Sequence, residues 1–274
     1  MKVTVIGGTG LVGSGVVARL AERGHEVVAA SRRTGVDALT GRGLAEALRG
    51  AATVVDVSDA PSYEDAVATE FFTAATRNLL AAEAAAGVRH HVALSLVGLE
   101  WVPDSGYFRA KRAQEGLIRD GGIPYSIVRA TQFYEFVEEI ARVESATGTI
   151  TVPPALVQPV AAADVAAAVC AVALGPPVDG IVEVGGPEQF RLDVLIDRWL
   201  TARGDGRPVV PDQTAPYFGA VLDERDLLPQ FSATIGPTRL AAWLSGSAGA
   251  PDRPDLLATG SAEPRSITAP SAGP

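Results

Sequence analysis

The sequence opens with a β-branched run that passes directly into three spaced glycines, KVTVIGGTGLVG at residues 2–13. The run predicts a buried strand at about Val3–Ile6, and the residues after it have the apolar spacing of a helix. A strand, a glycine turn and a helix in this order are typical of a phosphate-binding unit. We expect Gly7 to permit the tight turn, Gly10 to let backbone approach a pyrophosphate, and Gly13 to allow close helix–strand packing.

Strand and helix patterns keep alternating along the first half of the chain. Further strands are expected at Glu26–Ala30 and within ATVVDVSD, HHVALSL and YSIVRA. Helices are expected over SYEDAVATEFFTAATRNLLAAEAAAG and over Tyr107–Asp120, where Gly121 and Gly122 follow. This alternation predicts an α/β fold with a parallel sheet covered by helices on both faces.

Composition limits the classes of partner. The formal net charge is -9 and the isoelectric point is about 4.9, whereas nucleic acids and anionic membranes attract basic surfaces. The longest apolar stretch, residues 160–174, is broken by Asp164 and is too short to span a bilayer. With one cysteine and no signal-peptide pattern, we expect a cytoplasmic protein that binds a small molecule, no nucleic acid and no membrane.

The end of the second expected strand indicates which dinucleotide would bind. Selectors of NAD usually carry an acidic residue there for the ribose 2′-hydroxyl. This chain has Ser31, Arg32 and Arg33 instead. Because a guanidinium binds a phosphate with paired hydrogen bonds, the segment favours the 2′-phosphate of NADP(H).

Lysine is rare in this chain, and one of its two lysines is Lys111, four residues after Tyr107. Residues four apart share a helix face, and a nearby ammonium favours the phenolate and lowers the pKa of a tyrosine. Ser95 ends the strand HVALS, at the sheet edge where ligands bind. We therefore expect Ser95, Tyr107 and Lys111 to be catalytic. His25, His90 and His91 have no companions at metal-ligand spacing, so no metal site is expected.

GGTGLVG, ALS and YFRAK resemble the short-chain dehydrogenase/reductase family, and residues 1–245 are similar to its atypical NmrA-like branch of NAD(P)H-binding proteins. GIPYSIVRATQFYEF, QPVAAADVAAAV and VEVGGPE carry the closer resemblance. It implies a Rossmann-like, doubly wound parallel sheet and a small C-terminal substrate-binding lobe, built mainly from 131–160 and 185–245. Residues 246–274, of which 13 are Gly, Pro or Ser, are expected to form a flexible tail.

The resemblance also implies residue roles. Ser95 would orient the substrate oxygen, Tyr107 would transfer its proton, and Lys111 would hold the nicotinamide ribose and lower the tyrosine pKa. The family's proton-relaying asparagine aligns with Phe72, and Asp59 stands where an uncharged polar residue is usual. The expected cofactor-binding residues are Gly7, Thr9, Gly10, Leu11, Val12, Gly13, Ser31, Arg32, Arg33, Asp37, Lys111, Ala130, Thr131 and Phe133.

Trp101, Phe133 and Tyr134 are the expected substrate-binding residues. If they line the pocket, the substrate presents an apolar or aromatic face. The sequence thus predicts an NADPH-dependent reductase of a carbonyl-type group on a small organic molecule, with Tyr107 as proton donor. Two alternatives remain open: a non-catalytic NADP-binding redox sensor of NmrA type, and a non-redox epimerase, dehydratase or isomerase that uses the same pocket.

Overall fold

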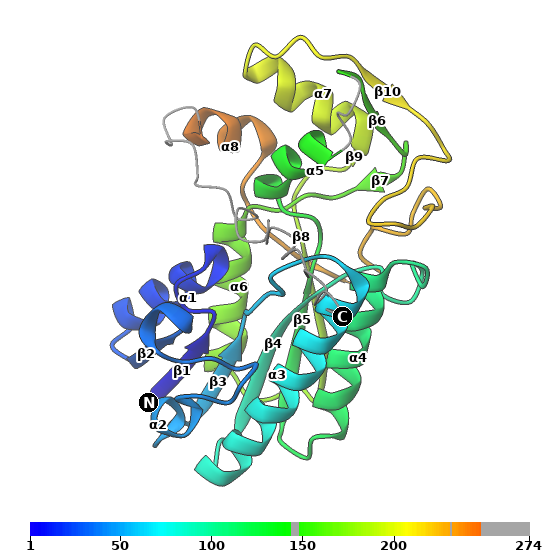
Figure 1. The fold of residues 1–274 in the computed structure, drawn as a ribbon. Helices are drawn as coiled ribbons and strands as arrows, with labels where there is room; N and C mark the ends of the chain where they lie inside the picture. The colour runs from blue at the N-terminus through cyan, green and yellow to red at the C-terminus, as the bar shows by residue number, and fades with distance from the viewer. Residues whose placement is uncertain (144–147, 231, 248–274) are drawn as a thin grey trace, which may run out of the picture.

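A computed structural model describes residues 1–143, 148–230 and 232–247 of the chain. Within these ranges one sheet of seven parallel strands forms the centre of the molecule (Figure 1). In spatial order the strands are β11 (Thr234–Ile235), β8 (Gly180–Gly185), β5 (Tyr125–Ala130), β4 (His90–Leu96), β3 (Thr53–Asp56), β1 (Lys2–Ile6) and β2 (Glu26–Ala30). The Rossmann-like, doubly wound sheet predicted from the alternating pattern is confirmed.

The strand order fixes where a ligand can bind. From β1 the chain adds β2 on one side, and from β3 it adds β4 and β5 on the other side. The winding direction therefore reverses between β1 and β3, and in open α/β sheets ligands bind outside the carboxyl ends of the strands at such a reversal. The glycine turn at Gly7 and the loop at Ser58 and Asp59 follow these two strands directly.

Helices cover both faces of the sheet (Figure 1). One face carries α1 (Leu11–Glu22) and α6 (Ala162–Leu174); the other carries α2 (Leu44–Leu48), α3 (Asp65–Ala86) and α4 (Gly106–Asp120). Because side chains alternate along a strand, Val55 and Val92 pack toward α1 and α6, whereas Val54 and Ala93 pack toward the opposite helices. No helix in the described ranges is long and apolar enough to cross a membrane.

The remaining elements lie beyond the carboxyl edge of the sheet, at the top of Figure 1. They are η2 (Tyr134–Phe136), α5 (Val137–Val143), β6 (Ile150–Val152), β7 (Leu156–Val157), β9 (Phe190–Arg191), α7 (Leu192–Ala202), β10 (Val209–Pro211) and α8 (Leu240–Ser247). Their core, which includes Tyr134, Ile150 and Trp199, is continuous with Leu99 and Phe108 of the sheet domain. Helix α8 includes residues 246 and 247 of the expected tail, and residues 248–274 lie outside the described ranges.

A buried ion pair ties α3 to β4. His91 Nδ1 lies 2.8 Å from Glu83 Oε1, and both side chains are fully buried. Burial by itself would lower the pKa of His91, but the charge and hydrogen bond of Glu83, with a further contribution from Asp56, raise it. The charged pair therefore stabilises the fold fully below the unfolded histidine pKa of about 6.5. That contribution is lost as the pH rises through the raised folded pKa.

We predict that Glu83→Gln destabilises the protein more at pH 6 than at pH 9. The expected loss at pH 6 is about 1.5–3 kcal/mol, the scale of a hydrogen bond to a charged group. Chemical denaturation at both pH values measures it. Glu46→Gln is the control, because the Glu46–Arg49 pair is exposed and is worth less than about 1 kcal/mol. A loss that stays constant or grows toward pH 9 would contradict the assignment of a charged His91.

Candidate active site

The glycine turn after β1 has the geometry of an anion cradle. Gly7 has φ 79°, in the left-handed region that glycine tolerates, and its N–H donates to Ala30 O at 2.9 Å. A Cβ at Gly13 would lie 2.1 Å from Gly7 O, so the start of α1 packs directly on the turn. In the described structure no side chain caps α1 at Gly10, which leaves its first N–H groups and its dipole for an anion. The cradle fits the pyrophosphate of a dinucleotide.

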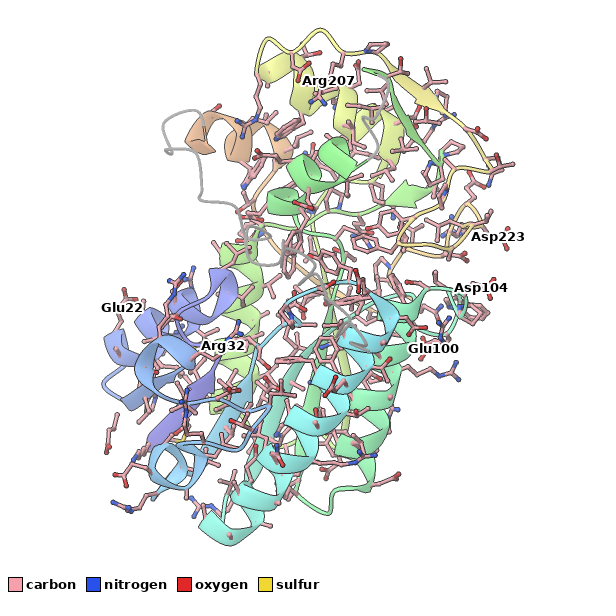
Figure 2. All side chains as sticks on the ribbon, in the orientation of Figure 1. Glu22, Arg32, Glu100, Asp104, Arg207 and Asp223 are labelled. Carbon is pink, nitrogen blue, oxygen red and sulfur yellow. The ribbon has the colours of Figure 1, made fainter. Side chains whose placement is uncertain are left out.

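The loop after β2 places two arginines beside this cradle. The chain turns there through η1 (Arg32–Thr34), which is fastened by a 2.8 Å hydrogen bond from Ser31 N–H to Thr34 Oγ1. Arg32 and Arg33 are exposed, and Figure 2 shows Arg32 on the β2 side of the sheet. The side chain of Asp37 accepts the Leu39 N–H at 3.1 Å, so the structure gives it a local turn-forming role.

Helix α4 brings Tyr107 and Lys111 to the carboxyl edge of the sheet. Gly106 lets the first turn of α4 approach the first turn of α3, because a Cβ there would lie 2.5 Å from Asp65 Cβ. An ion pair between Arg109 and Asp65 links the same two turns. The position and direction of Tyr107 are therefore set by the α3–α4 contact, and not by its helix alone.

The Tyr107 hydroxyl donates to Asp59 Oδ1 at 2.8 Å. Burial of the phenol, together with the charge and hydrogen bond of Asp59, raises the pKa of Tyr107 well above its usual value. Burial likewise raises the pKa of Asp59, against the opposing effects of the Lys111 charge and the Tyr107 hydrogen bond. The expected lowering of the tyrosine pKa by Lys111 is therefore wrong for this arrangement.

Lys111 is buried, and its ammonium is held from several directions. Its Nζ donates to Leu94 O at 2.8 Å and to Gln114 Oε1 at 2.5 Å, and it lies 4.4 Å from the centroid of the Phe72 ring. Gln114 in turn donates to Asp56 Oδ2 at 3.1 Å. An ammonium has three donors, so within the described residues one is left that could meet a ligand hydroxyl. The aromatic ring of Phe72, the residue expected to align with the relaying asparagine, stabilises the ammonium through its face.

Ser95 is buried in a network of polar side chains. Its hydroxyl donates to Glu115 Oε1 at 2.7 Å, and Arg129 binds both oxygens of the same carboxylate at 2.8 and 2.7 Å. Glu115 follows Tyr107 by eight residues, which is about 12 Å along a helix at ~1.5 Å per residue. The structure thus gives Ser95 a part in the buried network joining β4, β5 and α4.

Aromatic rings surround Tyr107. The rings of Tyr63 and Phe72 meet it edge-on at centroid distances of 5.2 and 5.7 Å, and Phe218 lies at 6.2 Å. Phe218 has φ 48° in a tight turn closed by the Tyr217 and Ala220 backbones, a conformation that bulky residues rarely adopt. Neither Tyr63 nor Phe218 was predicted from the sequence, and the aromatic–glycine pair at 218–219 was the available turn signal.

The other expected pocket residues divide into three cases. Trp101 is 54% exposed and lines a shallow cavity of about 420 Å³ with Arg225 and Gln230. Phe133 is partly buried against the cluster that contains Leu11 and Val12, beside the glycine turn. Tyr134 is fully buried and stacks on Trp243 at 5.3 Å, so it supports the lobe and has no surface for a substrate.

Two further expected cofactor residues lie at the end of β5. Ala130 and Thr131 are both buried there, and the Thr131 hydroxyl donates to Gln158 O at 2.6 Å. That bond fastens the loop after β5 to the chain that leads into α6. Any contact of Thr131 with a cofactor would therefore come from its backbone.

The chain is similar in sequence to known proteins. Residues 7–176 match the sequence profile of an NAD(P)H-binding family. A curated relative from Streptomyces griseus subsp. griseus, (4-alkanoyl-5-oxo-2,5-dihydrofuran-3-yl)methyl phosphate reductase, is 34% identical over 206 residues, which are 68% of this chain and 68% of that protein.

Solved structures with the same fold include two NAD complexes. MoeE5 with UDP-glucose and NAD has a TM-score of 0.69 and 18% identity over 89% of this chain and 96% of that chain. The UDP-glucose 4-epimerase of Thermus thermophilus with NAD has a TM-score of 0.66 and 21% identity over 94% of this chain and 96% of that chain. At these identities the likeness extends to the fold alone.

Proposed function

From the premise that the chain belongs to the NAD(P)H-binding family and is an NAD(P)-dependent oxidoreductase, we propose that it is a reductase that uses NADPH and protonates its substrate through Tyr107. The observation that carries the proposal is the Tyr107–Lys111 pair on one face of α4, at the carboxyl edge of the sheet that also holds the glycine cradle. A redox sensor would need the cradle but not this pair.

The substrate is proposed to carry a carbonyl-type group on an apolar or aromatic frame. Tyr63, Phe72 and Phe218 supply flat apolar surfaces around the Tyr107 hydroxyl. The Streptomyces griseus relative is named as a reductase of an oxo-dihydrofuran with an alkanoyl group, which is a carbonyl compound. A bound nicotinamide would supply the hydride.

The protein's own contribution is the proton. Reduction of a carbonyl-type group builds negative charge on its oxygen, and a phenol within hydrogen-bond reach can neutralise that charge. The raised pKa of Tyr107 keeps its proton in place at neutral pH. The phenol is then present as the proton donor, and transfer is driven by the substrate oxygen, which becomes strongly basic as the hydride is added.

The direct test is a substrate screen that follows NADPH absorbance. Alkanoyl-substituted oxo-dihydrofurans, with and without the methyl phosphate, should be tried first, together with simple aromatic ketones and aldehydes. We expect NADPH consumption and a product that has gained two hydrogens. Tight NADPH binding without turnover on the whole panel would favour the redox sensor, and an isomerised or dehydrated product without NADPH loss would favour the non-redox enzyme.

We further predict that NADPH binds at least tenfold more tightly than NADH, a gap of about 1.4 kcal/mol. The reason is that the exposed Arg32 and Arg33 follow β2, where an NAD enzyme would have a carboxylate. Arg32→Ala and Arg33→Ala should weaken NADPH binding and leave NADH binding unchanged in calorimetry. Arg49→Ala, on an exposed arginine after α2, is the matched control. Equal affinities for the two nucleotides in the wild type would exclude the assignment.

A further inference from the structure

The proposed reaction has so far given no role to Asp59. It follows β3 at the carboxyl edge of the sheet, and its Oδ1 accepts both the Tyr107 hydroxyl and the Ala60 N–H at 2.8 Å. A carboxylate in a dinucleotide crevice repels phosphate, so its presence there calls for a role. Among the described residues Asp59 is the hydrogen-bond partner that the structure gives the Tyr107 hydroxyl.

A proton donor in an enzyme must recover its proton after each turnover, and the neighbours of Tyr107 limit how it can do so. Lys111 uses two of its three donors on Leu94 O and Gln114 Oε1, and the third would hold a ligand hydroxyl. Phe72, at the position of the family's relaying asparagine, has a hydrocarbon ring that can neither give nor take a proton. Tyr63 and Phe218 contact Tyr107 through their rings.

Asp59 combines the two contacts that a proton relay requires. Its carboxyl oxygen touches the phenol oxygen, and the residue is exposed at the molecular surface, where water can supply protons. The 2.8 Å separation fits a bond in either direction, because heavy-atom positions do not fix the hydrogen. With the carboxyl protonated, its O–H can donate to Tyr107 Oη while the phenol O–H turns to the substrate.

We propose that Asp59 is the proton relay of Tyr107, connecting the phenol to solvent in place of the family's asparagine. The inference rests on the proposed reductase function. Tyr107 gives its proton to the substrate oxygen, the resulting phenolate takes the carboxyl proton of Asp59, and the Asp59 carboxylate takes one from water. One proton thus passes from solvent to product in each turnover, and both side chains return to their starting states.

The packed surroundings of the Asp59 carboxyl favour a group that holds a proton more readily than usual. Although part of the residue is exposed, the protein atoms packed around its carboxyl raise its pKa and Asp56 adds to the rise, while Lys111, the Tyr107 hydroxyl and the Ala60 N–H lower it. Tyr63 lies on the same side and its own pKa is raised, after burial, by the Asp59 charge. The productive form is the protonated carboxyl, so turnover should fall as the pH rises through the pKa of Asp59.

The test compares Asp59→Asn and Asp59→Glu with the wild type. An amide cannot pass on a proton in this way, so Asp59→Asn should lower kcat by about 10- to 100-fold, somewhat less than loss of a general acid. The alkaline decline of kcat should disappear in Asp59→Asn, with KM and NADPH affinity changed less than about threefold. Asp59→Glu should restore part of kcat and a decline at a shifted pH. Asp104→Asn, on an exposed carboxylate before α4 that Figure 2 labels, is the matched control.

A spectroscopic measurement checks the carboxyl without turnover. The infrared difference between wild type and Asp59→Asn should contain a carboxylic acid band that fades as the pH rises. Wild-type kcat with an unchanged pH profile in Asp59→Asn would overturn the relay. Unchanged kcat with about tenfold tighter NADPH binding would also overturn it, and would mean that the Asp59 carboxylate acts by repelling the cofactor phosphates.

The outcomes separate the relay from the reductase proposal. If Asp59→Asn does not fold, as its melting temperature would show, Asp59→Glu decides: an unshifted pH profile in that variant overturns the relay. An impaired Tyr107→Phe beside a fully active Asp59→Asn removes the relay alone. If Tyr107→Phe is itself fully active, the proton-donor assignment fails, and the relay with it.

Discussion

Replacing Tyr107 by phenylalanine is expected to lower turnover by about 10²–10⁴-fold, the usual scale of general acid catalysis. The substitution removes one oxygen and keeps the ring, so the contacts with Tyr63, Phe72 and Phe218 remain. NADPH affinity should change less than about twofold, because the glycine cradle and the arginines after β2 are untouched. The lost hydrogen bond to Asp59 is partly exposed and should cost no more than about 1 kcal/mol of folding free energy.

Single-turnover and steady-state kinetics on any accepted substrate measure this effect. The matched control is Tyr125→Phe, which removes a phenol oxygen at the start of β5, at the opposite edge of the sheet. We expect its kinetics to match the wild type. If Tyr107→Phe also keeps wild-type turnover, Tyr107 is not the proton donor and the site works through other residues.

The central sheet could be predicted because its signals are local. The strand expected at Glu26–Ala30 has those bounds in the structure, and the helix expected at Tyr107–Asp120 begins one residue earlier, at Gly106. Apolar runs of four to seven residues and the glycines that end helices specify these elements without reference to distant parts of the chain.

The short strands of the C-terminal lobe were harder to predict from the sequence, because each pairs with a strand that lies far along the chain. Strand β6 pairs with β10 about sixty residues later, and β7 pairs with β9 over two residues each. Elements of two or three residues carry too little pattern to be recognised, and tertiary contacts decide them. For the same reason the turn that holds Phe218 against Tyr63 and Tyr107 was not foreseen.

The errors at the site have the same physical origin. Lys111 is visible as a neighbour of Tyr107 because it lies one helical turn away. Burial of the phenol, together with Asp59 from 48 residues upstream, reverses the expected direction of the tyrosine pKa. Ser95 was placed at a strand end correctly, but the strand's alternation points its hydroxyl to Glu115. Sequence pattern gives the element on which a residue lies more readily than the neighbour that its side chain meets.

The second large effect is expected from a substitution in the glycine cradle, at Gly13. A Cβ at position 13 would lie 2.1 Å from Gly7 O and 2.9 Å from Gly8 Cα, whereas non-bonded carbon atoms prefer about 3.5–4.0 Å. Both obstacles are backbone, so either the turn or the start of α1 must move by about an ångström or more. That movement displaces the N–H groups that would bind the pyrophosphate.

We therefore predict that Gly13→Ala weakens NADPH binding by about 100-fold, or about 2.7 kcal/mol, and that NADH binding falls by the same factor. Overpacking should also cost about 1–3 kcal/mol of folding stability. Gly116→Ala is the control: this helical glycine has open space around its Cβ position, and alanine should stabilise α4 by about 0.5–1 kcal/mol. Calorimetric titration and thermal melting of both variants decide the matter. Equal losses of affinity for the two nucleotides would distinguish this effect from that of Arg32 and Arg33, which should act on NADPH alone. Unchanged binding in Gly13→Ala would mean that the dinucleotide does not use this turn.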